Sequence, residues 1–362
     1  MDKLQKARKM INEIDAKMSA LFCARMEAAK LVAEHKQEHG LPIFDKAREQ
    51  IVIENNAKLV EDDEIRSYYI NFLKYTMKLS RQYQHMLISG MKVAYSGVEG
   101  AFAHIAAGKI FPDANLIPYS DFDSAYEAVV AGECDCAVMP IENSYAGEVG
   151  QVLDLMFKGS LYINGVYDLE VSQNLIGLPN SRLSDIREVV SHPQALMQCA
   201  GFIKENGFEQ IQEVNTAIAA QKVAEGGDKS VAAIAGKETA DLYGLKIIEK
   251  DINESSFNTT RFAVFSRAQN MDKAPGNHFL MLFTVGHVAG ALAKAIHVIG
   301  RHGFNMRVLR SRPVKDSNWQ YYFYVEAEGN VNSEEGQKML DELKEYCEQL
   351  KVVGNYSNQI VL

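Results

Sequence analysis

The sequence has few cysteines, no long apolar run and no excess of basic residues, and each absence excludes a class of protein. The five cysteines are an odd number without a C-x-x-C pair, so we expect neither a disulfide framework nor a structural zinc site. No apolar run reaches membrane-spanning length and the first residues show no signal-peptide core, which predicts a cytoplasmic protein without a membrane partner. The net charge of −9 argues against nucleic acid as a partner.

The length of 362 residues is too great for a single hydrophobic core. Changes in residue pattern divide the chain into three expected domains: a helical one over residues 1–90, an alternating α/β one over 91–267, and a small α+β one over 277–362. A polar linker that ends in Pro275-Gly276 marks the second boundary.

The first module carries an apolar stripe at alternating three- and four-residue steps, which predicts one long helix that ends at Gly40. Such a helix would be about 50 Å long, too long for a compact monomer of this size. We therefore expect a second copy of the chain to cover part of it, as a homodimer or a larger homo-oligomer. The stripe consists of Leu4, Ala7, Ile11, Ile14, Met18, Leu21, Arg25, Ala28 and Val32.

Polar residues interrupt the apolar faces of this module. Arg25 lies within the stripe, where a guanidinium needs either a carboxylate partner in the protein or an anionic ligand. Ser80 and Gln84 share a face of a later helix with Leu73 and Met77. Three further polar residues open a middle helix, namely Asp45, Arg48 and Glu49. Polar groups from three helices therefore point towards one interior volume.

This arrangement resembles the all-helical chorismate mutase family. Chorismate carries two carboxylates and rearranges within itself, a reaction that requires a folded conformer and charge compensation at the ether oxygen, but no cofactor or metal. The resemblance implies that Arg25, Arg48 and Ser80 bind carboxylates together with Arg8 from a partner chain. The other matching residues would act on the ether oxygen (Lys36 and Gln84) and on the ring hydroxyl (Asp45 and Glu49).

Residues 91–267 alternate strand-like and helix-like segments, which predicts covered and largely parallel sheets. The turn Gly97-Val98-Glu99-Gly100 lacks the G-x-G-x-x-G spacing, so a dinucleotide site, and with it a prephenate dehydrogenase, is not supported. Expected strands are Ala137–Ile141, Leu175–Leu178, Glu188–Val190, Val231–Ala235 and Lys246–Ile248, and expected helices are Ser124–Ala131, Ala195–Glu205 and Ala217–Ala224.

One segment, residues 253–265, changes from small polar residues to an apolar strand and so places hydroxyls and a guanidinium at the mouth of a buried strand. Its Asn258-Thr259-Thr260-Arg261-Phe262 resembles the Asn-x-Thr-Arg-Phe signature of prephenate dehydratases. Three other landmarks of that family occur in order, at residues 95–102, 140–144 and 191–196. The resemblance implies two α/β lobes like those of type II periplasmic binding proteins, with the active site in the cleft and the Thr-Arg-Phe strand returning to the first lobe.

Prephenate loses its ring hydroxyl and a carboxylate together, so the enzyme must assist the departing hydroxyl and hold two carboxylates. Thr260 is the candidate for the departing hydroxyl, as a proton donor or as a group that only orients it. Asn143, Ser144 and Arg261 are candidate anchors for the substrate. Two titratable neighbours, Glu142 and His192, are in isolation more often structural than catalytic.

Residues 277–362 predict the order βαββαβ, an antiparallel sheet with helices on one face. Expected elements are Phe279–Val285, Gly290–His302, Asn305–Arg310, Tyr321–Ala327, Ser333–Leu350 and Val352–Tyr356. The order resembles the ferredoxin-like ACT domain, which senses amino acids. Effector candidates are Gly290, Ala291 and Leu292 in one motif and Ser311 and Arg312 in another. The sequence departs from the family at Arg310, where glutamate is usual, and at Ala289, where proline is usual.

These resemblances imply a bifunctional chorismate mutase and prephenate dehydratase with phenylalanine as effector, and with no cofactor or metal. The alternative from another class is a non-catalytic sensor of aromatic acids, built on binding-protein-like lobes and an ACT domain. Thr260 favours the enzyme, because a pure binder has no need of a hydroxyl at the departing group.

Overall fold

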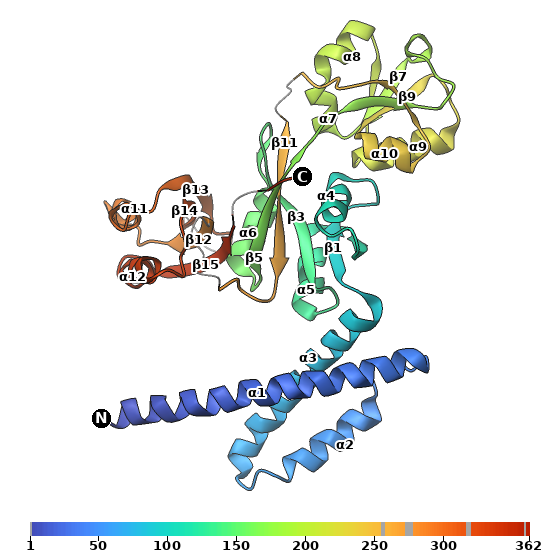
Figure 1. Ribbon diagram of the computed structural model, residues 1–362. Helices are drawn as coiled ribbons and strands as arrows, with labels where there is room; N and C mark the ends of the chain where they lie inside the picture. The colour runs from blue at the N-terminus through green and yellow to red at the C-terminus, as the bar shows by residue number, and fades with distance from the viewer. Residues whose placement is uncertain (1, 255–257, 272–277, 316–319, 358–359) are drawn as a thin grey trace. The chain divides into compact units, whose positions relative to one another are not determined.

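The computed structural model describes residues 2–254, 258–271, 278–315, 320–357 and 360–362, and the chain forms two compact units, Met1–Lys92 and Val93–Leu362. Three helices make up the first unit: α1 (Lys3–Glu38), α2 (Lys46–Ala57) and α3 (Asp63–Ser89) (Figure 1). Among the described residues, no helix combines the length and the hydropathy needed to cross a membrane.

Helix α1 confirms the predicted long helix. Asp2 and Gln5 form a capping box at its start, and Gly40, with a φ of 63°, follows its end. Its 36 residues correspond to about 54 Å. Of the residues of α1, only Ala29 and Ala33 are buried within a single chain, whereas Leu21 is 69% exposed. Most of the apolar stripe is therefore uncovered in a single chain.

The first lobe of the second unit is built on the strand order β5-β11-β3-β1-β2. Strand β11 enters between β3 and β5 and runs antiparallel to both, which confirms the predicted return of the Thr-Arg-Phe strand. The strands are β1 (Lys92–Ser96), β2 (Asn115–Tyr119), β3 (Cys136–Asn143), β4 (Gly147–Glu148), β5 (Tyr162–Glu170) and β11 (Thr259–Ser266), with helices α4 (Phe102–Ile110), α5 (Phe122–Ala131) and α6 (Gly150–Lys158).

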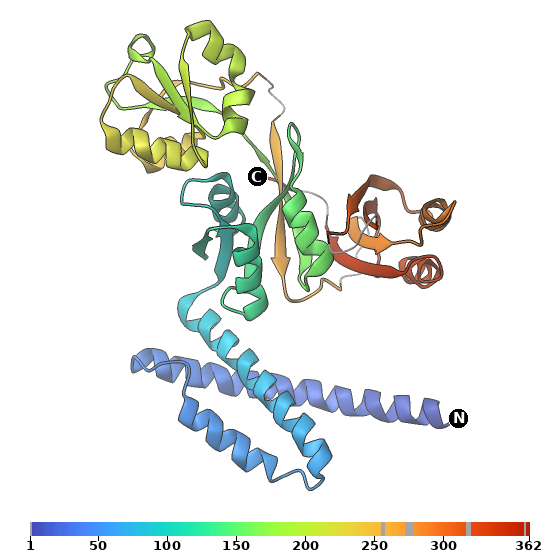
Figure 2. The same cartoon turned by 180° about the vertical axis from the view of Figure 1, so that it is seen from behind.

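The second lobe has the strand order β10-β6-β9-β7-β8. Successive residues of one strand, such as Val189 and Val190, point to opposite faces and belong to two cores, one under α7 and α8 and the other under α9 and α10, so helices cover both faces (Figures 1 and 2). Its elements are β6 (Asn174–Gly177), β7 (Glu188–Ser191), β8 (Glu209–Gln212), β9 (Val231–Ala235) and β10 (Lys246–Glu249), with α7 (Pro193–Gln198), α8 (Ala200–Asn206), α9 (Thr216–Gly226) and α10 (Lys237–Leu242).

Two details differ from the prediction for these lobes. The sheets are mixed rather than largely parallel, because β11 re-enters the first lobe antiparallel and β6 is antiparallel to both of its neighbours. The single helix expected over Ala195–Glu205 is divided at Cys199, whose backbone leaves the helical conformation.

The C-terminal part confirms the βαββαβ order, with strands arranged β13-β14-β12-β15. Its elements are β12 (His278–Thr284), α11 (Ala291–Arg301), β13 (Met306–Pro313), β14 (Tyr321–Glu328), α12 (Glu334–Leu343), β15 (Gln349–Tyr356) and β16 (Ile360–Val361). Helix α12 ends at Leu343 rather than at Leu350, because pairing of β15 with β12 begins at Gln349. Residues 255–257, the linker around Pro275 and Trp319 lie outside the described residues.

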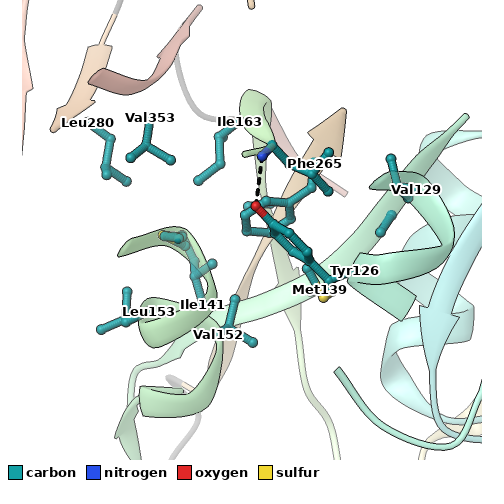
Figure 3. Close-up of a cluster of buried hydrophobic side chains, with 14 of the residues drawn as sticks. Tyr126, Val129, Met139, Ile141, Val152, Leu153, Ile163, Phe265, Leu280 and Val353 are labelled. Atoms are coloured by element: carbon teal, nitrogen blue, oxygen red, sulfur yellow. Dashed lines mark hydrogen bonds between the residues drawn. The ribbon is translucent and has the colours of Figure 1, made fainter. Parts of the chain in front are cut away.

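The C-terminal sheet and the first lobe share one sheet and one core. Strand β15 pairs with β5 at Gly354 and Ile163. Leu280 and Val353 of the C-terminal sheet belong to the same buried cluster as Ile163 (Figure 3). In this cluster the Tyr126 hydroxyl accepts a hydrogen bond of 2.7 Å from the Leu161 backbone. The C-terminal part is therefore directly packed against the strands that carry the Thr-Arg-Phe segment.

Candidate active sites

A small cavity in the first unit collects polar side chains from all three helices. It has a volume of about 150 Å³, and its lining includes seven of the eight residues that the chorismate mutase resemblance selected: Arg25, Lys36, Asp45, Arg48, Glu49, Ser80 and Gln84. The eighth, Arg8, is exposed in the N-terminal half of α1, and a single chain does not bring it to the cavity.

Hydrogen bonds fix several of these groups. Arg25 donates to the Ser80 hydroxyl and, at 3.4 Å, to the Thr76 carbonyl, and burial lowers the pKa of its guanidinium. Lys36 donates to the Ile43 carbonyl at 2.6 Å. Asp45 is the N-cap of α2 and accepts from the Arg48 backbone at 2.9 Å, which explains why a polar residue starts this helix.

Sequence reasoning missed Arg81, which also lines the cavity. Its guanidinium forms an ion pair with Glu49 and lies 5.2 Å from the centre of the Phe44 ring. The spacing of Arg81 from Met77 and Gln84 on α3 was the available signal.

Gln84 carries a buried amide oxygen without a hydrogen-bond partner among the described residues, so this amide is available to a ligand.

A second cavity, of about 250 Å³, is lined by residues of both α/β lobes. Thr260 and Asn143 come from adjacent strands of the first lobe. Its other lining residues include Ala101, Phe102, Val171, Gln173, His192, Gln194, Ala195, Gln198, Val214, Asn215 and Thr216.

The two lobes also meet at Gly100. A Cβ at this position would lie 2.9 Å from Leu242, and the Gly100 carbonyl accepts a hydrogen bond of 2.8 Å from Thr239. With a φ of 84°, this close turn requires glycine.

The Asn143 side chain organises the first-lobe side of this cavity. Its amide nitrogen donates to the Thr260 hydroxyl and to Asn258, both at 2.9 Å, while its oxygen accepts from the backbone of Tyr145 and Ala146. Because the Thr260 oxygen accepts this bond, its own proton is free to point elsewhere, including into the cavity. A hydroxyl is thus held in one place as a donor.

Three helices begin at the cavity: α4 at Ala101, α7 at His192 and α9 at Asn215. The backbone N–H groups of a first helical turn attract anions. His192 caps α7 by accepting from the Gln194 backbone at 3.2 Å, and burial lowers the pKa of its imidazole. Sequence reasoning did not select these helix starts, because only the fold brings three of them together.

Two predicted substrate anchors are not brought to the cavity. Successive side chains of a strand point to opposite faces, so Arg261 lies behind Thr260. There it contacts Asp168 at 3.4 Å, Glu326 at 3.3 Å and Glu142 at 3.6 Å. Burial alone would lower the pKa of Arg261, but these carboxylates outweigh burial and raise it. Ser144 instead accepts from the Thr259 backbone at 2.9 Å and fastens the start of β11.

A third cavity, of about 560 Å³, lies in the C-terminal part. Gly290 is the N-cap of α11, and Ala291 and Leu292 line the cavity together with Glu348. The other two effector candidates, Ser311 and Arg312, lie on β13 and do not line it. Arg312 instead contacts Glu148 at 2.5 Å and Asp154 at 3.3 Å.

One group of side chains among the described residues could hold a metal ion. It consists of His35, Glu38 and His39, whose ligand atoms lie within 4.8 Å of one another at the exposed end of α1. It lies outside the three cavities described above.

Comparison with known proteins assigns the two parts of the chain that contain the first two cavities to families. Residues 7–85 match the family model of chorismate mutase type II, and residues 93–270 match that of prephenate dehydratase. A bifunctional chorismate mutase/prephenate dehydratase from Enterobacter agglomerans is 31% identical over 372 residues, which cover 98% of this chain and 96% of that protein.

Solved structures resemble the second unit. The prephenate dehydratase of Arthrobacter aurescens in complex with L-Phe aligns with a TM-score of 0.69 and 26% identity, covering 74% of this chain and 90% of that one. GqqA, described as a novel type of quorum-quenching acylase, aligns with a TM-score of 0.69 and 33% identity, covering 74% and 97%.

Two compact units, each containing a cavity with polar side chains and each matched by a catalytic family, define a bifunctional enzyme. The chain belongs to the bifunctional chorismate mutase/prephenate dehydratase family. It converts chorismate to prephenate and prephenate to phenylpyruvate, which rules out the non-catalytic sensor.

Proposed function

We propose that the first-unit cavity is the mutase site, with Arg25 and Arg48 binding the chorismate carboxylates and Ser80 assisting. The observation that carries this assignment is the convergence of seven selected residues on one volume. Lys36 and Gln84 then compensate charge that develops on the ether oxygen. Asp45 and Glu49 orient the ring hydroxyl. Arg81 holds Glu49 in place through their ion pair.

Arg8 completes this site from a second copy of the chain, in a dimer formed along α1. The exposed side chains of Leu4, Ile11 and Ile14 support this proposal, because a second α1 would bury them. Mixing inactive Arg8→Ala and Arg25→Ala chains tests it. If Arg8 is contributed by the partner, mixed dimers regain one intact site, and mutase activity returns to about a quarter of the normal value. A mixture that stays inactive, although the subunits have exchanged, contradicts the proposal.

The cavity between the lobes is, we propose, the dehydratase site. Thr260 donates a hydrogen bond to the departing ring hydroxyl and orients it, and Asn143 fixes the Thr260 oxygen; the 2.9 Å hydrogen bond between Asn143 and Thr260 carries this assignment. The starts of α4, α7 and α9 hold the two carboxylates of prephenate through backbone N–H groups. Arg261 and Ser144 support the strands instead of binding substrate, given their contacts with protein groups.

The Thr260→Val variant tests this site, because valine keeps the shape and removes the hydroxyl. Loss of one donor to developing charge lowers kcat by about 10²- to 10³-fold. Thr259→Val is the matched control, since the neighbouring side chain lies on the opposite face of β11. A Thr260→Val enzyme with near-normal dehydratase activity contradicts the assignment.

The boundaries 1–90, 91–267 and 277–362 are proposed as chorismate mutase, dehydratase and ACT domains. Phenylalanine, we propose, binds between ACT domains of two chains and inhibits the dehydratase. The cavity at the start of α11 supports this, because the Gly290–Leu292 turn offers N–H groups to a carboxylate and Glu348 offers a carboxylate to an ammonium group. Ser311 and Arg312 do not line this cavity within one chain, so any role in effector binding requires the partner chain.

A further inference from the structure

A network of charged side chains joins β13 of the C-terminal part to the catalytic strand β3. Arg310 contacts Glu142 and, at 3.7 Å, Glu148. Arg312 contacts Glu148 and Asp154, and Asp154 also accepts from the Tyr322 hydroxyl at 2.9 Å. These side chains are largely shielded from water, with Arg310 26% and Glu142 27% exposed.

The Glu142 carboxylate is shared by two arginines from different parts of the chain. Arg310 reaches it from β13, and Arg261 reaches it from β11 at 3.6 Å. Glu142 immediately precedes Asn143, and Arg261 immediately follows Thr260. Asn143 and Thr260, which meet in the cavity, therefore have a carboxylate and two guanidinium groups behind them, on the other face of the same two strands.

The β3–β11 ladder is irregular at this point. Thr260 pairs with Asn143 and Arg261 with Glu142, but Phe262 pairs with Pro140, so Ile141 is an extra residue on β3. Such a bulge re-aims the neighbouring side chains and locally weakens the ladder. An ion pair beside the bulge restricts how far the end of β3 can shift, and Asn143 lies at that end.

We propose that Arg310 is a positioning residue for the dehydratase reaction: through Glu142, it holds the bulged end of β3 so that the Asn143 amide meets the Thr260 hydroxyl. This inference rests on the proposed dehydratase site. Arg310 touches no substrate. The glutamate that the resembling family usually has at this position would repel Glu142 and Glu148, so this link depends on the arginine of this chain.

The test measures steady-state dehydratase kinetics of Arg310→Met, Glu142→Gln and the double variant. We expect Arg310→Met to lower kcat by about tenfold and to leave KM within about twofold, because a misplaced donor affects the transition state more than binding. Arg310→Lys, which keeps the charge, should recover most of the lost kcat. The double variant should be no worse than Glu142→Gln alone, because both changes break the same link.

The controls separate positioning from folding. Chorismate mutase activity of the same preparations reports on the other unit and should be unchanged, and the melting temperature reports on stability. Arg301→Met removes an exposed arginine that pairs with Glu342 on α12, and should leave dehydratase kcat unchanged. A normal kcat in Arg310→Met overturns the inference. So does a double variant in which the losses of the two single variants add, because the two changes then act independently, and so does an Arg310→Lys variant that recovers none of the lost kcat. If the proposed dehydratase site itself is wrong, a different result shows it: Thr260→Val then keeps its dehydratase activity.

Discussion

Replacing Arg25 by methionine should affect activity and stability in opposite directions. Arg25 donates to the Ser80 hydroxyl and the Thr76 carbonyl, and among the described residues it forms no ion pair with a carboxylate. Burial disfavours its charge, as its lowered pKa indicates. The free enzyme therefore holds a guanidinium whose solvation is only partly replaced, an arrangement that becomes favourable when an anionic substrate arrives.

Methionine keeps much of the side-chain length and removes the charge. We expect the free energy of unfolding to change by no more than about 1 kcal/mol, and towards greater stability, because the cost of burying the charge disappears. Mutase kcat/KM should fall by about 10²- to 10³-fold, or roughly 3 to 4 kcal/mol, because a carboxylate then lacks its partner in a dry site.

Chorismate consumption and thermal unfolding of the same preparation measure both effects. Arg66→Met is the control, because Arg66 pairs with Asp63 and caps backbone carbonyls away from the cavity; it should cost stability and spare activity. The reasoning is refuted if Arg25→Met stays within tenfold of normal activity, or if it destabilises the first unit by more than about 2 kcal/mol.

Two further predictions concern the second unit. His192 has a lowered pKa in the folded state, so its contribution to stability is present above its unfolded-state pKa and is lost as the pH falls through its folded-state pKa. His192→Asn keeps a cap for α7 and should flatten the decline in melting temperature below about pH 6. An unchanged decline contradicts this role of His192. Glu348→Gln should weaken inhibition by phenylalanine by about tenfold if Glu348 binds the ammonium group. Glu345 is an exposed neighbour outside the cavity, so Glu345→Gln should leave inhibition unchanged. Equal inhibition in both variants counts against the proposed effector site.

Local sequence patterns were sufficient for much of the fold. The three- and four-residue spacing predicted α1, and Asp45 marked the start of α2, because caps and periodicity act within a few residues. The βαββαβ order was also readable. The end of α12 was not, since pairing of β15 with β12, which lies some 65 residues away in sequence, sets where the helix must stop.

Several site residues were predictable from motifs that lie far apart in the sequence. Thr260 and Asn143 were selected from separate motifs and meet in the structure. Arg261 was selected as a candidate substrate anchor but does not line the cavity, and the alternation of side chains along a strand could have indicated that it and Thr260 point apart. The partners of Arg310 could not be foreseen, because Glu142 is 168 residues away in sequence and only the tertiary fold brings the two side chains together.

The central claim is that one chain carries two independent active sites, and crossed product analysis tests it most directly. Chorismate and prephenate are each supplied to Arg25→Ala and to Thr260→Val, and prephenate and phenylpyruvate are followed by NMR. We predict that Thr260→Val converts chorismate to prephenate and stops there, whereas Arg25→Ala leaves chorismate untouched and still converts supplied prephenate to phenylpyruvate. Loss of both activities in either folded variant would contradict the account.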